Sequence, residues 1–424
     1  MPDNTALTYA KESDINDPLK NFREKFYIPF LHNKNAIYFL GNSLGLQPKS
    51  TQDEVLNIME DWASYGVEGF FYGKNPWLHY SKQLLQPIAK IIGALPNEVV
   101  LMNHLTVNLH LMMISFYNPT PSRYKIICEA KAFPSDQYVF ESQAKLHGFN
   151  AEDAIVEVSP KAGTEIISTD DIITAIEKNK DSAALVLFSA VNYYTGQVFD
   201  IKKITAAAHQ YGMVAGFDLA HAAGNIALHL HEDEVDFACW CNYKYLNSGP
   251  GAIAGAYVNE KHLQHKNIKR LNGWWGNDVS NRFKMEKTFT PYPTAEAWQL
   301  STPPLMLLAA LHASLKIFED AGFENLLQKQ KKLSAYSFEL LNDINAENKY
   351  FEILTPQSPA ERGCQVSLAF HQKGKEVFEA LSKNGVMTDW REPNVIRIAP
   401  VPLYNSFEEV YQFSEILKSI VTSN

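Results

Sequence analysis

The sequence predicts an α/β fold in which a large domain holds a mostly parallel, doubly wound sheet and a smaller α+β domain follows it. Two observations predict this arrangement. Short apolar runs that are typical of buried strands alternate with helical patterns over much of the chain, and such alternation builds parallel sheets. After about residue 310 the alternation is replaced by two helical patterns and a few short strands, as expected of a second, smaller unit.

The large domain is predicted from the apolar runs and the helical patterns between them. Strands are expected at residues 98–102, 124–128, 184–188 and 213–217. Helices are expected at residues 107–116, 135–147, 168–178 and 201–211, and Thr106 is expected to cap the first of these. The alternation implies one sheet with helices on both faces.

The smaller domain is predicted from the change of pattern near residue 310. Helices are expected at residues 309–321, 326–344 and 408–421, and short strands at residues 365–370 and 395–400. We therefore expect an N-terminal segment over residues 1–49 that packs on the small domain, a large domain over 50–310 and a small domain over 311–424.

The composition excludes several classes of protein. The chain has 424 residues, of which 46% are apolar and 20% charged, as in an ordinary folded protein. Its 38 Lys and Arg residues against 47 Asp and Glu residues give a net charge of −9, and this acidity argues against nucleic-acid binding. No apolar stretch approaches the ~20 residues of a membrane span, and the N-terminal residues lack the apolar core of a secretion signal.

The cysteines and histidines give little support to a metal site. The four cysteines are scattered, which is typical of reduced thiols in a cytoplasmic protein, and Cys239 and Cys241 lack the usual zinc-binding spacing. Residues 229–234 gather imidazoles and carboxylates, but adjacent ligands on one loop rarely close a tetrahedral site. We expect no metal and a cytoplasmic location; a metal-dependent hydrolase is the rival that this run would support.

Polar side chains follow several predicted strands, where open parallel sheets bind their ligands. Asp218 ends the run 213–217, and an acid there is costly to bury unless it meets a cation or strong donors. Lys244 lies in an apolar and aromatic stretch, and burial lowers the pKa of a lysine, as a Schiff-base lysine requires. Taken singly, each residue has a simpler interpretation, a turn cap or a lysine that reaches solvent at a strand edge. Together they suggest pyridoxal phosphate, which needs a lysine and an acid beside its pyridine nitrogen.

Three further residues at strand ends fit the same cofactor. Thr106 at a helix N-terminus offers a phosphate site. Phe133 offers a ring that can stack on an aromatic cofactor, and Ser189 offers a hydroxyl. Each signal is weak alone, but the set is more specific than any one member.

Long motifs along the chain resemble the signature segments of the kynureninases. They lie at residues 39–45, 105–106, 133–136, 194–197, 216–221, 240–247 and 397–405. The resemblance covers the chain from about residue 20 to residue 420. It implies a fold-type-I pyridoxal phosphate enzyme, similar to aspartate aminotransferase, that works as a homodimer with active sites at the subunit interface.

The resemblance also implies an activity. Kynureninases hydrolyse the Cβ–Cγ bond of L-kynurenine to anthranilate and L-alanine, in tryptophan catabolism or in the supply of NAD precursors. Members that prefer the 3-hydroxylated substrate carry asparagine where this chain has Thr302, and histidine in the segment that reads Gly69-Phe70-Phe71 here. We therefore expect kynurenine to be preferred and 3-hydroxykynurenine to be cleaved less well, to 3-hydroxyanthranilate.

Residue roles follow from the same resemblance. Lys244 matches the lysine that bonds the cofactor, Asp218 the partner of the pyridine nitrogen, and Arg397 the arginine that holds the substrate carboxylate. Tyr243 is a candidate donor to the oxyanion that forms when the ketone is hydrated. Further cofactor contacts are expected from Leu105, Thr106, Phe133, Pro134, Ser135, Asp136, Ser189, His221, Tyr243, Trp274 and Thr302. Further substrate contacts are expected from Asn42, Ser43, Phe70 and Trp275.

Another enzyme of the same fold, such as a cysteine desulfurase, is the main alternative. A desulfurase needs a reactive thiolate on a mobile loop, and Cys364 is the only candidate, directly before a predicted strand. A catalytically silent scaffold is a further alternative, against which the presence of Lys244, Asp218 and Arg397 argues.

Overall fold

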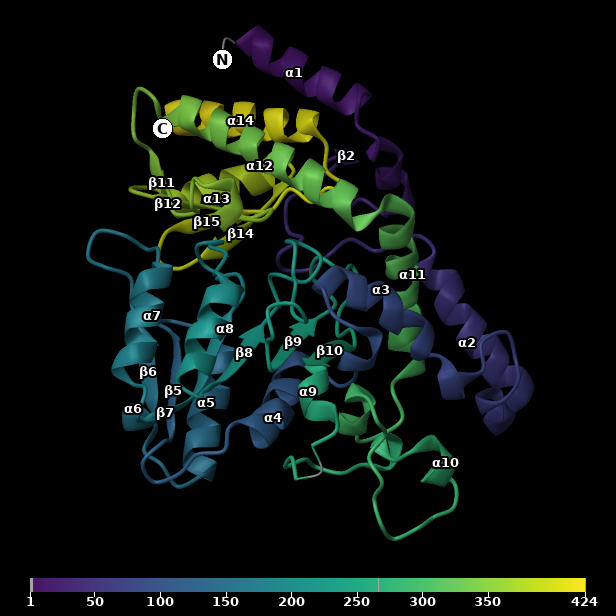
Figure 1. The fold of residues 1–424 in the computed structure, drawn as a ribbon. Helices are drawn as coiled ribbons and strands as arrows, with labels where there is room; N and C mark the ends of the chain where they lie inside the picture. The colour runs from purple at the N-terminus through teal and green to yellow at the C-terminus, as the bar shows by residue number, and fades with distance from the viewer. Residues whose placement is uncertain (1–2, 266, 424) are drawn as a thin grey trace.

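A seven-stranded sheet forms the centre of the fold. The structure is a computed structural model that describes residues 3–265 and 267–423 (Figure 1). Neighbouring strands are parallel from β9 to β6, whereas β10 runs antiparallel to both β4 and β9. The predicted α/β class with a mostly parallel sheet is confirmed. In spatial order the strands are β4 (Val99–Leu101), β10 (Ala254–Val258), β9 (Phe237–Cys241), β8 (Val214–Asp218), β7 (Ala183–Ser189), β5 (Lys125–Glu129) and β6 (Ile155–Val158).

Alternate residues of the central strand β7 face two separate apolar cores. Val186 and Phe188 belong to one core, whereas Leu185 and Leu187 belong to the other. All four side chains are fully buried. Because both faces of the sheet are covered, this strand reads in the sequence as a continuous apolar run.

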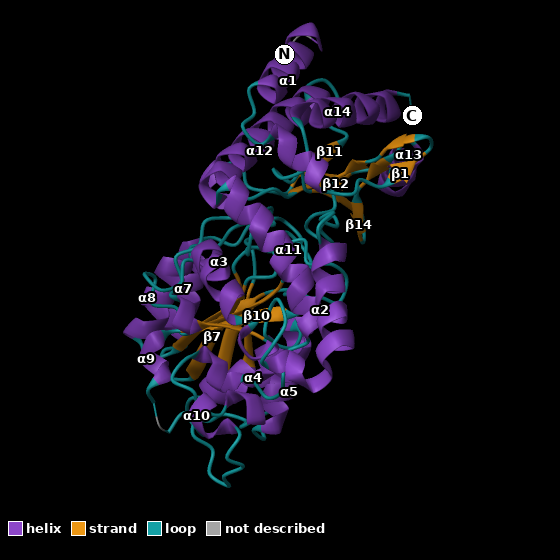
Figure 2. Ribbon diagram, turned by 90° about the vertical axis from the view of Figure 1, so that its right-hand side faces the viewer, coloured by secondary structure: helices purple, strands orange, loops and turns teal. Residues whose placement is uncertain are grey.

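Helices cover both faces of the sheet (Figure 2). The core that contains Leu185 lies under α4 (Leu105–Phe116) and α5 (Pro134–Leu146). The opposite core is built with α2 (Thr51–Tyr65), α3 (Lys82–Ile92), α7 (Thr169–Lys178), α8 (Ile201–Gln210) and α11 (Leu305–Ala321). Short helices lie at α6 (Ala151–Ala154), α9 (Glu260–Leu263) and α10 (Val279–Arg282).

Three strands of the large sheet, β6, β9 and β10, have no counterpart among the predictions. β10 is the clearest case, because it begins with Ala254, Gly255 and Ala256, which carry little strand signal. A Cβ atom on Gly255 would lie 2.1 Å from the ring of Trp240. The small residue therefore lets the indole of β9 lie directly on the backbone of its neighbour.

Thr106 is not the cap of α4, so that detail of the prediction is wrong. His104 takes the N-cap position with an extended backbone, and the helix begins at Leu105. The chain turns into the helix at Asn103, whose φ is +48°, directly after β4. Thr106 therefore lies inside the first turn, where backbone N–H groups have no helical partner.

A second, antiparallel sheet lies in the C-terminal part of the chain. Its strands, in spatial order, are β11 (Phe351–Ile353), β12 (Val366–Phe370), β15 (Val395–Ile398) and β14 (Asp389–Arg391). A third apolar core joins this sheet to α12 (Phe323–Asn345), α13 (Gly374–Lys383) and α14 (Phe407–Thr422). The predicted helices and strands of this region are present, with ends shifted by a few residues.

The first helix, α1 (Asp3–Ile15), packs beside α14, as Figure 1 shows. The Asp14 carboxylate accepts the backbone N–H groups of Phe407 and Glu408 at 2.8 and 2.9 Å, at the N-terminus of α14. A short hairpin, β1 (Phe30–Leu31) and β2 (Lys34–Asn35), precedes β3 (Ile37–Tyr38), which pairs in parallel with β13 (Val386–Met387). The domain limits near residues 49 and 310 stay a prediction. Within residues 3–265 and 267–423, no helix is long and apolar enough to cross a bilayer.

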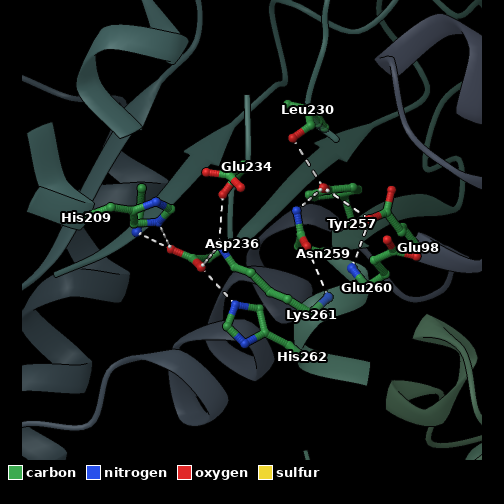
Figure 3. Close-up of polar contacts among 11 residues, drawn as sticks. Glu98, His209, Leu230, Glu234, Asp236, Tyr257, Asn259, Glu260, Lys261 and His262 are labelled. Carbon is green, nitrogen blue, oxygen red and sulfur yellow. Dashed lines mark hydrogen bonds and ion pairs between the residues drawn. The ribbon is translucent and has the colours of Figure 1, made fainter. Parts of the chain in front are cut away.

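A buried ionic cluster closes the end of the sheet where β9 begins (Figure 3). The carboxylate of Asp236, directly before β9, lies 2.8 Å from Nε2 of His209, 2.7 Å from Nε2 of His262 and 2.8 Å from Nζ of Lys261. It also accepts the backbone N–H of Ala215 at 2.8 Å. One carboxylate therefore joins α8, β8 and α9.

Hydrogen bonds determine the ionisation of Asp236. Burial alone would raise its pKa, but hydrogen bonds from His209, His262, the Ala215 amide and Lys261 outweigh burial and hold the pKa far below its usual range. The neighbouring Glu98 is likewise buried and lies 3.0 Å from Nδ1 of His231. Among the described residues, no three His, Cys, Asp or Glu side chains are arranged to hold a metal ion.

We expect Asp236→Asn to lower the free energy of unfolding by roughly 3 kcal/mol at pH 7, because one partner of a buried ionic cluster is lost. Because the folded pKa of Asp236 is depressed, its contribution is complete above the unfolded pKa of about 4 and falls as the pH drops below that value. The difference between variant and wild type should therefore shrink below pH 4. Urea unfolding at several pH values measures it, with the exposed Glu232→Gln as a matched control. Equal stability of Asp236→Asn and wild type at pH 7 would contradict the assignment.

Candidate functional site

A cavity of about 250 Å³ lies where β7 and β8 end and the chain turns after β9. Ten of the residues predicted from the sequence line it: Leu105, Thr106, Phe133, Ser135, Asp136, Ser189, Asp218, His221, Tyr243 and Lys244. They come from distant parts of the chain and from both halves of the sheet. The structure therefore brings together most of the predicted cofactor residues.

The turn that carries Lys244 is held by a loop from the N-terminal part of the chain. Gly45 donates its backbone N–H to the carbonyl of Tyr243 at 2.8 Å. A Cβ atom on Gly45 would lie 2.3 Å from the carbonyl oxygen of Lys244, so only glycine permits this approach. The Lys244 Nζ lies 5.9 Å from the ring centres of both Phe133 and Tyr243, which surround it in the cavity. The motif at residues 39–45 thus positions the lysine.

Asp218 and Asp136 form a buried pair of carboxyl groups beside Lys244. Burial raises the pKa of Asp218, and the charge of Lys244 and the N–H of Ala220, 2.6 Å away, partly oppose this. Burial, together with the neighbouring charges of Asp218 and Glu129, raises the pKa of Asp136 well above its usual value. Asp136 therefore keeps its proton more readily and shares it with Asp218 by a hydrogen bond.

His221 lies near the same pair and is neutral. Burial is the main cause that lowers its pKa well below the usual value, and the nearby charges of Lys244, Arg397 and Arg391 lower it further. Its Nδ1 is buried and has no hydrogen-bond partner among the described residues. A buried, unpartnered ring nitrogen in a cavity is a group that a ligand would satisfy.

The N-terminus of α4 faces the cavity through Leu105 and Thr106. Backbone N–H groups at such a terminus, together with the helix dipole, favour an anion. His104 at the cap position also lines the cavity, and its Nε2 lies 3.3 Å from the carbonyl oxygen of Gly251. This end of the cavity therefore suits a phosphate.

Arg397 does not line the cavity itself, but it donates a hydrogen bond to Tyr193, which does. Its guanidinium is buried and donates to the carboxylate of Asp389 and to the carbonyl of Tyr193. Tyr193 lines the cavity, and its ring centre lies 5.1 Å from that of Phe133. Nε of Arg397 is buried and has no partner among the described residues.

Asn42 joins the same network from the N-terminal loop. Its side-chain amide donates to Gln365 at 2.9 Å, and Gln365 donates to the carbonyl of Tyr193 at 2.9 Å. Ser43 is exposed beside Asn42, and Pro134 is the first residue of α5; neither lines the cavity.

The remaining predicted residues lie away from the cavity of the single chain. The rings of Phe70 and Trp275 are 6.1 Å apart, and that of Trp274 is 5.7 Å from Trp275. Trp274 is 48% exposed, an unusual exposure for tryptophan. Thr302 is partly exposed directly before Pro303 and α11. The roles of these four residues stay predictions.

Sequence reasoning missed four lining residues and one buried acid. The lining residues are His104, Val191, Tyr193 and Ala220. His104 and Tyr193 directly precede the motifs at residues 105–106 and 194–197, so extending each motif by one residue would have found them. The buried acid is Glu129, which follows the predicted strand 124–128 by one residue and ends β5.

Comparison with known proteins fits this geometry. A kynureninase from Flavobacterium psychrophilum is 54% identical over 419 residues, which cover 99% of each chain. The chain belongs to the kynureninase family. The human kynureninase is 46% identical over 98% of this chain and 93% of its own. The family model described as "Kynureninase C-terminal domain" matches residues 326–417.

Solved structures resemble this chain in fold. The apo structure of a cysteine desulfurase from Thermococcus onnurineus has a TM-score of 0.77 at 18% identity, over 96% of this chain and 98% of that one. A mutant of C-DES, solved with glycine covalently linked to its pyridoxal phosphate, has a TM-score of 0.75 at 18% identity, over 93% and 98% of the chains. At this identity the likeness concerns the fold alone, which is fold type I.

Proposed function

We propose that the protein is a pyridoxal phosphate-dependent hydrolase that cleaves L-kynurenine to anthranilate and L-alanine. The single observation that carries the proposal is the convergence of Lys244, Asp218 and the N-terminus of α4 on one cavity in a chain of the kynureninase family. In the reaction, the oxygen of water adds to Cγ, the Cβ–Cγ bond breaks, and Cβ gains a proton. The step belongs to tryptophan catabolism and supplies precursors of NAD.

The residues of the cavity fit pyridoxal phosphate. Asp218 suits the protonated pyridine nitrogen, the exposed ring of Phe133 suits the face of the cofactor, and the N-terminus of α4 suits its phosphate. When bound, the cofactor supplies an electron sink that stabilises negative charge on the carbon skeleton of the substrate. The buried Nδ1 of His221 gains a partner when the cavity is filled.

Lys244 holds the cofactor and moves the proton of the reaction. Its amino group would hold the cofactor, and as a free amine it would take up the proton that leaves Cα of the substrate. Asp218 would face the ring nitrogen and favour a proton there, because its partner Asp136 keeps the proton that the pair shares more readily than Asp218 does.

Tyr243 is the donor that we assign to the substrate ketone. Burial and the neighbouring Cys241 raise the pKa of its phenol, so it remains protonated at neutral pH. A protonated phenol can donate to the oxygen of Cγ as water adds and negative charge develops there.

Arg397 is the group that we assign to the substrate carboxylate, since a guanidinium fork binds a carboxylate through two hydrogen bonds. In the resting chain Asp389 and the Tyr193 carbonyl hold this guanidinium, which leaves Nε free of a protein partner among the described residues. Asn42 supports the arrangement through Gln365 and Tyr193.

A cysteine desulfurase is the weaker candidate. Such an enzyme needs an accessible thiolate. Cys364 is buried, and burial raises the pKa of its thiol, so the thiol stays protonated. All four cysteines are free and buried, which also supports the proposed cytoplasmic location.

We expect Lys244→Ala to lose kynurenine cleavage by about 10³-fold or more, because both the bond to the cofactor and the proton transfer are lost. Anthranilate fluorescence with L-kynurenine measures the rate, and the wild type should be yellow as well as active. Lys261→Ala, in the remote cluster of Figure 3, is the control for loss of a lysine. Turnover by Lys244→Ala near the wild-type rate would overturn the assignment.

We expect kynurenine to have a higher kcat/KM than 3-hydroxykynurenine. Thr302 offers less hydrogen-bonding capacity than the asparagine of relatives that prefer the hydroxylated substrate. The segment Gly69-Phe70-Phe71 has no polar side chain where those relatives have a histidine. Thr302→Asn should move the ratio of the two kcat/KM values toward 3-hydroxykynurenine. A wild-type preference for 3-hydroxykynurenine would contradict this interpretation.

We also propose that the protein is a homodimer in which each partner completes the other's site. Trp274, Phe71 and Phe283 form an exposed aromatic cluster, with exposed fractions of 48%, 52% and 48%, next to Trp275 and Phe70. A monomer rarely leaves such a patch open to water. Shared sites explain why Phe70 and the two tryptophans lie outside the cavity of their own chain.

A mixing experiment tests the shared site. Lys244→Ala and Trp274→Ala should each be nearly inactive, but coexpression should restore about a quarter of wild-type activity, because half of the randomly assembled dimers hold one intact composite site. Light scattering should give twice the chain mass. A monomer in solution, or no activity restored by coexpression, would contradict the proposal.

A further inference from the structure

Glu129 is a buried acid next to the cavity that takes no part in the proposed reaction. It ends β5 with 2% of its surface exposed. Both carboxylate oxygens lie 3.1 Å from the backbone nitrogen of Ser189, and one of them accepts the hydrogen of the Ser189 hydroxyl. The carboxylate of Glu129 therefore accepts both hydrogens that Ser189 can donate, from its backbone N–H and from its hydroxyl.

Ser189 lines the cavity at the end of β7 and pairs across the sheet with Asp218 of β8. A hydroxyl has one hydrogen to donate and two lone pairs to accept with. Because Glu129 takes the hydrogen, the lone pairs of Ser189 are left for the cavity. Glu129 therefore makes Ser189 an acceptor toward whatever the cavity holds.

Glu129 is also the third carboxyl group of one buried cluster. Its charge acts on Asp136, and the charge of Asp218 acts on it in turn. Other titratable groups near this cluster are Cys128 on the same strand, Cys239 and Cys241 on β9, and His221, Tyr243 and Lys244 in the cavity. Three carboxyl groups beside a single lysine cannot all ionise cheaply in a buried site, so the cluster retains protons.

We propose that Glu129 is a positioning residue of the cofactor site, which fixes the Ser189 hydroxyl as an acceptor toward the cofactor and adds negative charge behind Asp218 and Asp136. The inference rests on the proposed use of pyridoxal phosphate. Glu129 itself does not touch the cavity, since Ser189 lies between them.

The role of Glu129 depends on its ionisation. Burial raises its pKa to about 7, against the opposing effect of the hydrogen bonds from Ser189. The carboxyl group thus changes charge near neutral pH. A neutral Glu129 can donate to Ser189 instead of accepting from it, which would release the serine hydrogen toward the cavity.

The test is a double-mutant cycle on pyridoxal phosphate binding. Apoenzyme of the wild type, Glu129→Gln, Ser189→Ala and the double variant is titrated with pyridoxal phosphate, and the Kd is read from protein fluorescence. Each single change should weaken binding about tenfold, because a charge-assisted hydrogen bond is lost, and the double variant should bind little worse than either single one. Glu157→Gln, on the neighbouring strand β6, is the matched control and should bind as the wild type does.

A second readout distinguishes positioning from a general loss of structure. In the bound enzyme, the visible absorption of the lysine-linked cofactor changes with pH as that linkage takes up a proton. Removing the charge of Glu129 disfavours the protonated, positively charged form, so Glu129→Gln should move the midpoint about 0.5–1 pH unit lower. Ser189→Ala leaves this carboxylate in place and should move the midpoint less. If Glu129→Gln does not fold, Ser189→Ala and its Kd decide the role of the hydroxyl.

The outcomes are separable from those of the proposed function. Wild-type Kd and an unmoved midpoint in Glu129→Gln would overturn this inference alone. Fully additive losses in the double variant would overturn the part in which Glu129 acts through Ser189. Tight binding of pyridoxal phosphate by a wild type that does not cleave kynurenine would remove the proposed reaction and leave the inference standing, whereas a wild type that binds no pyridoxal phosphate would remove both.

Discussion

The burial of negative charge at the ends of β5 and β8 is the constraint on which the site depends. Asp218 and Asp136 line the cavity and Glu129 lies behind it, and all three side chains are buried. Such a cluster is stable only when cations, backbone donors and shared protons compensate it. Lys244, the N–H groups of Ala220 and Ser189, and the hydroxyls of Ser135 and Ser189 supply that compensation. Each comes from a segment that also lines the cavity, so the electrostatic and geometric demands are met by the same residues.

The same sheet carries a second ionic cluster at its other end, with the opposite outcome. Around Asp236, hydrogen bonds from two histidines and a lysine outweigh burial, and the acid is fully ionised. Around Asp136, like charges add to burial, and the acid keeps its proton. The fold therefore uses buried acids in two ways. One joins helices to the sheet, and the other keeps protons available where chemistry is proposed.

Local pattern and long-range contact differ in how much they could be predicted from the sequence. Runs such as residues 184–188, buried on both faces, identified the sheet and its class, because their composition reflects burial directly. β10 could not be predicted from its own residues, because Gly255 is required by the packing of the Trp240 ring, which lies on another strand. Asp218 could be predicted because parallel strands bring their ends to one edge of the sheet. Lys244 could be predicted because a lysine is unusual in an apolar and aromatic stretch. The hydrogen bond between Ser189 and Glu129 depends on how β5 and β7 lie side by side, and Arg397 reaches the cavity only through Tyr193. These relations exist only in the folded chain.

The contact of Gly45 with the turn at Lys244 has a consequence for the order of folding. Residues about two hundred positions apart must meet before the lysine is held, and Asn42 must likewise find Gln365 across most of the chain. Contacts of such long sequence separation tend to form late in folding, because the chain loses conformational entropy when a long loop closes, before the contact can stabilise it. The turn at Lys244 is therefore complete only when the N-terminal loop has reached it. The cofactor would then bind only to chains in which the N-terminal loop and the C-terminal part have both folded into place, so that binding selects fully folded molecules.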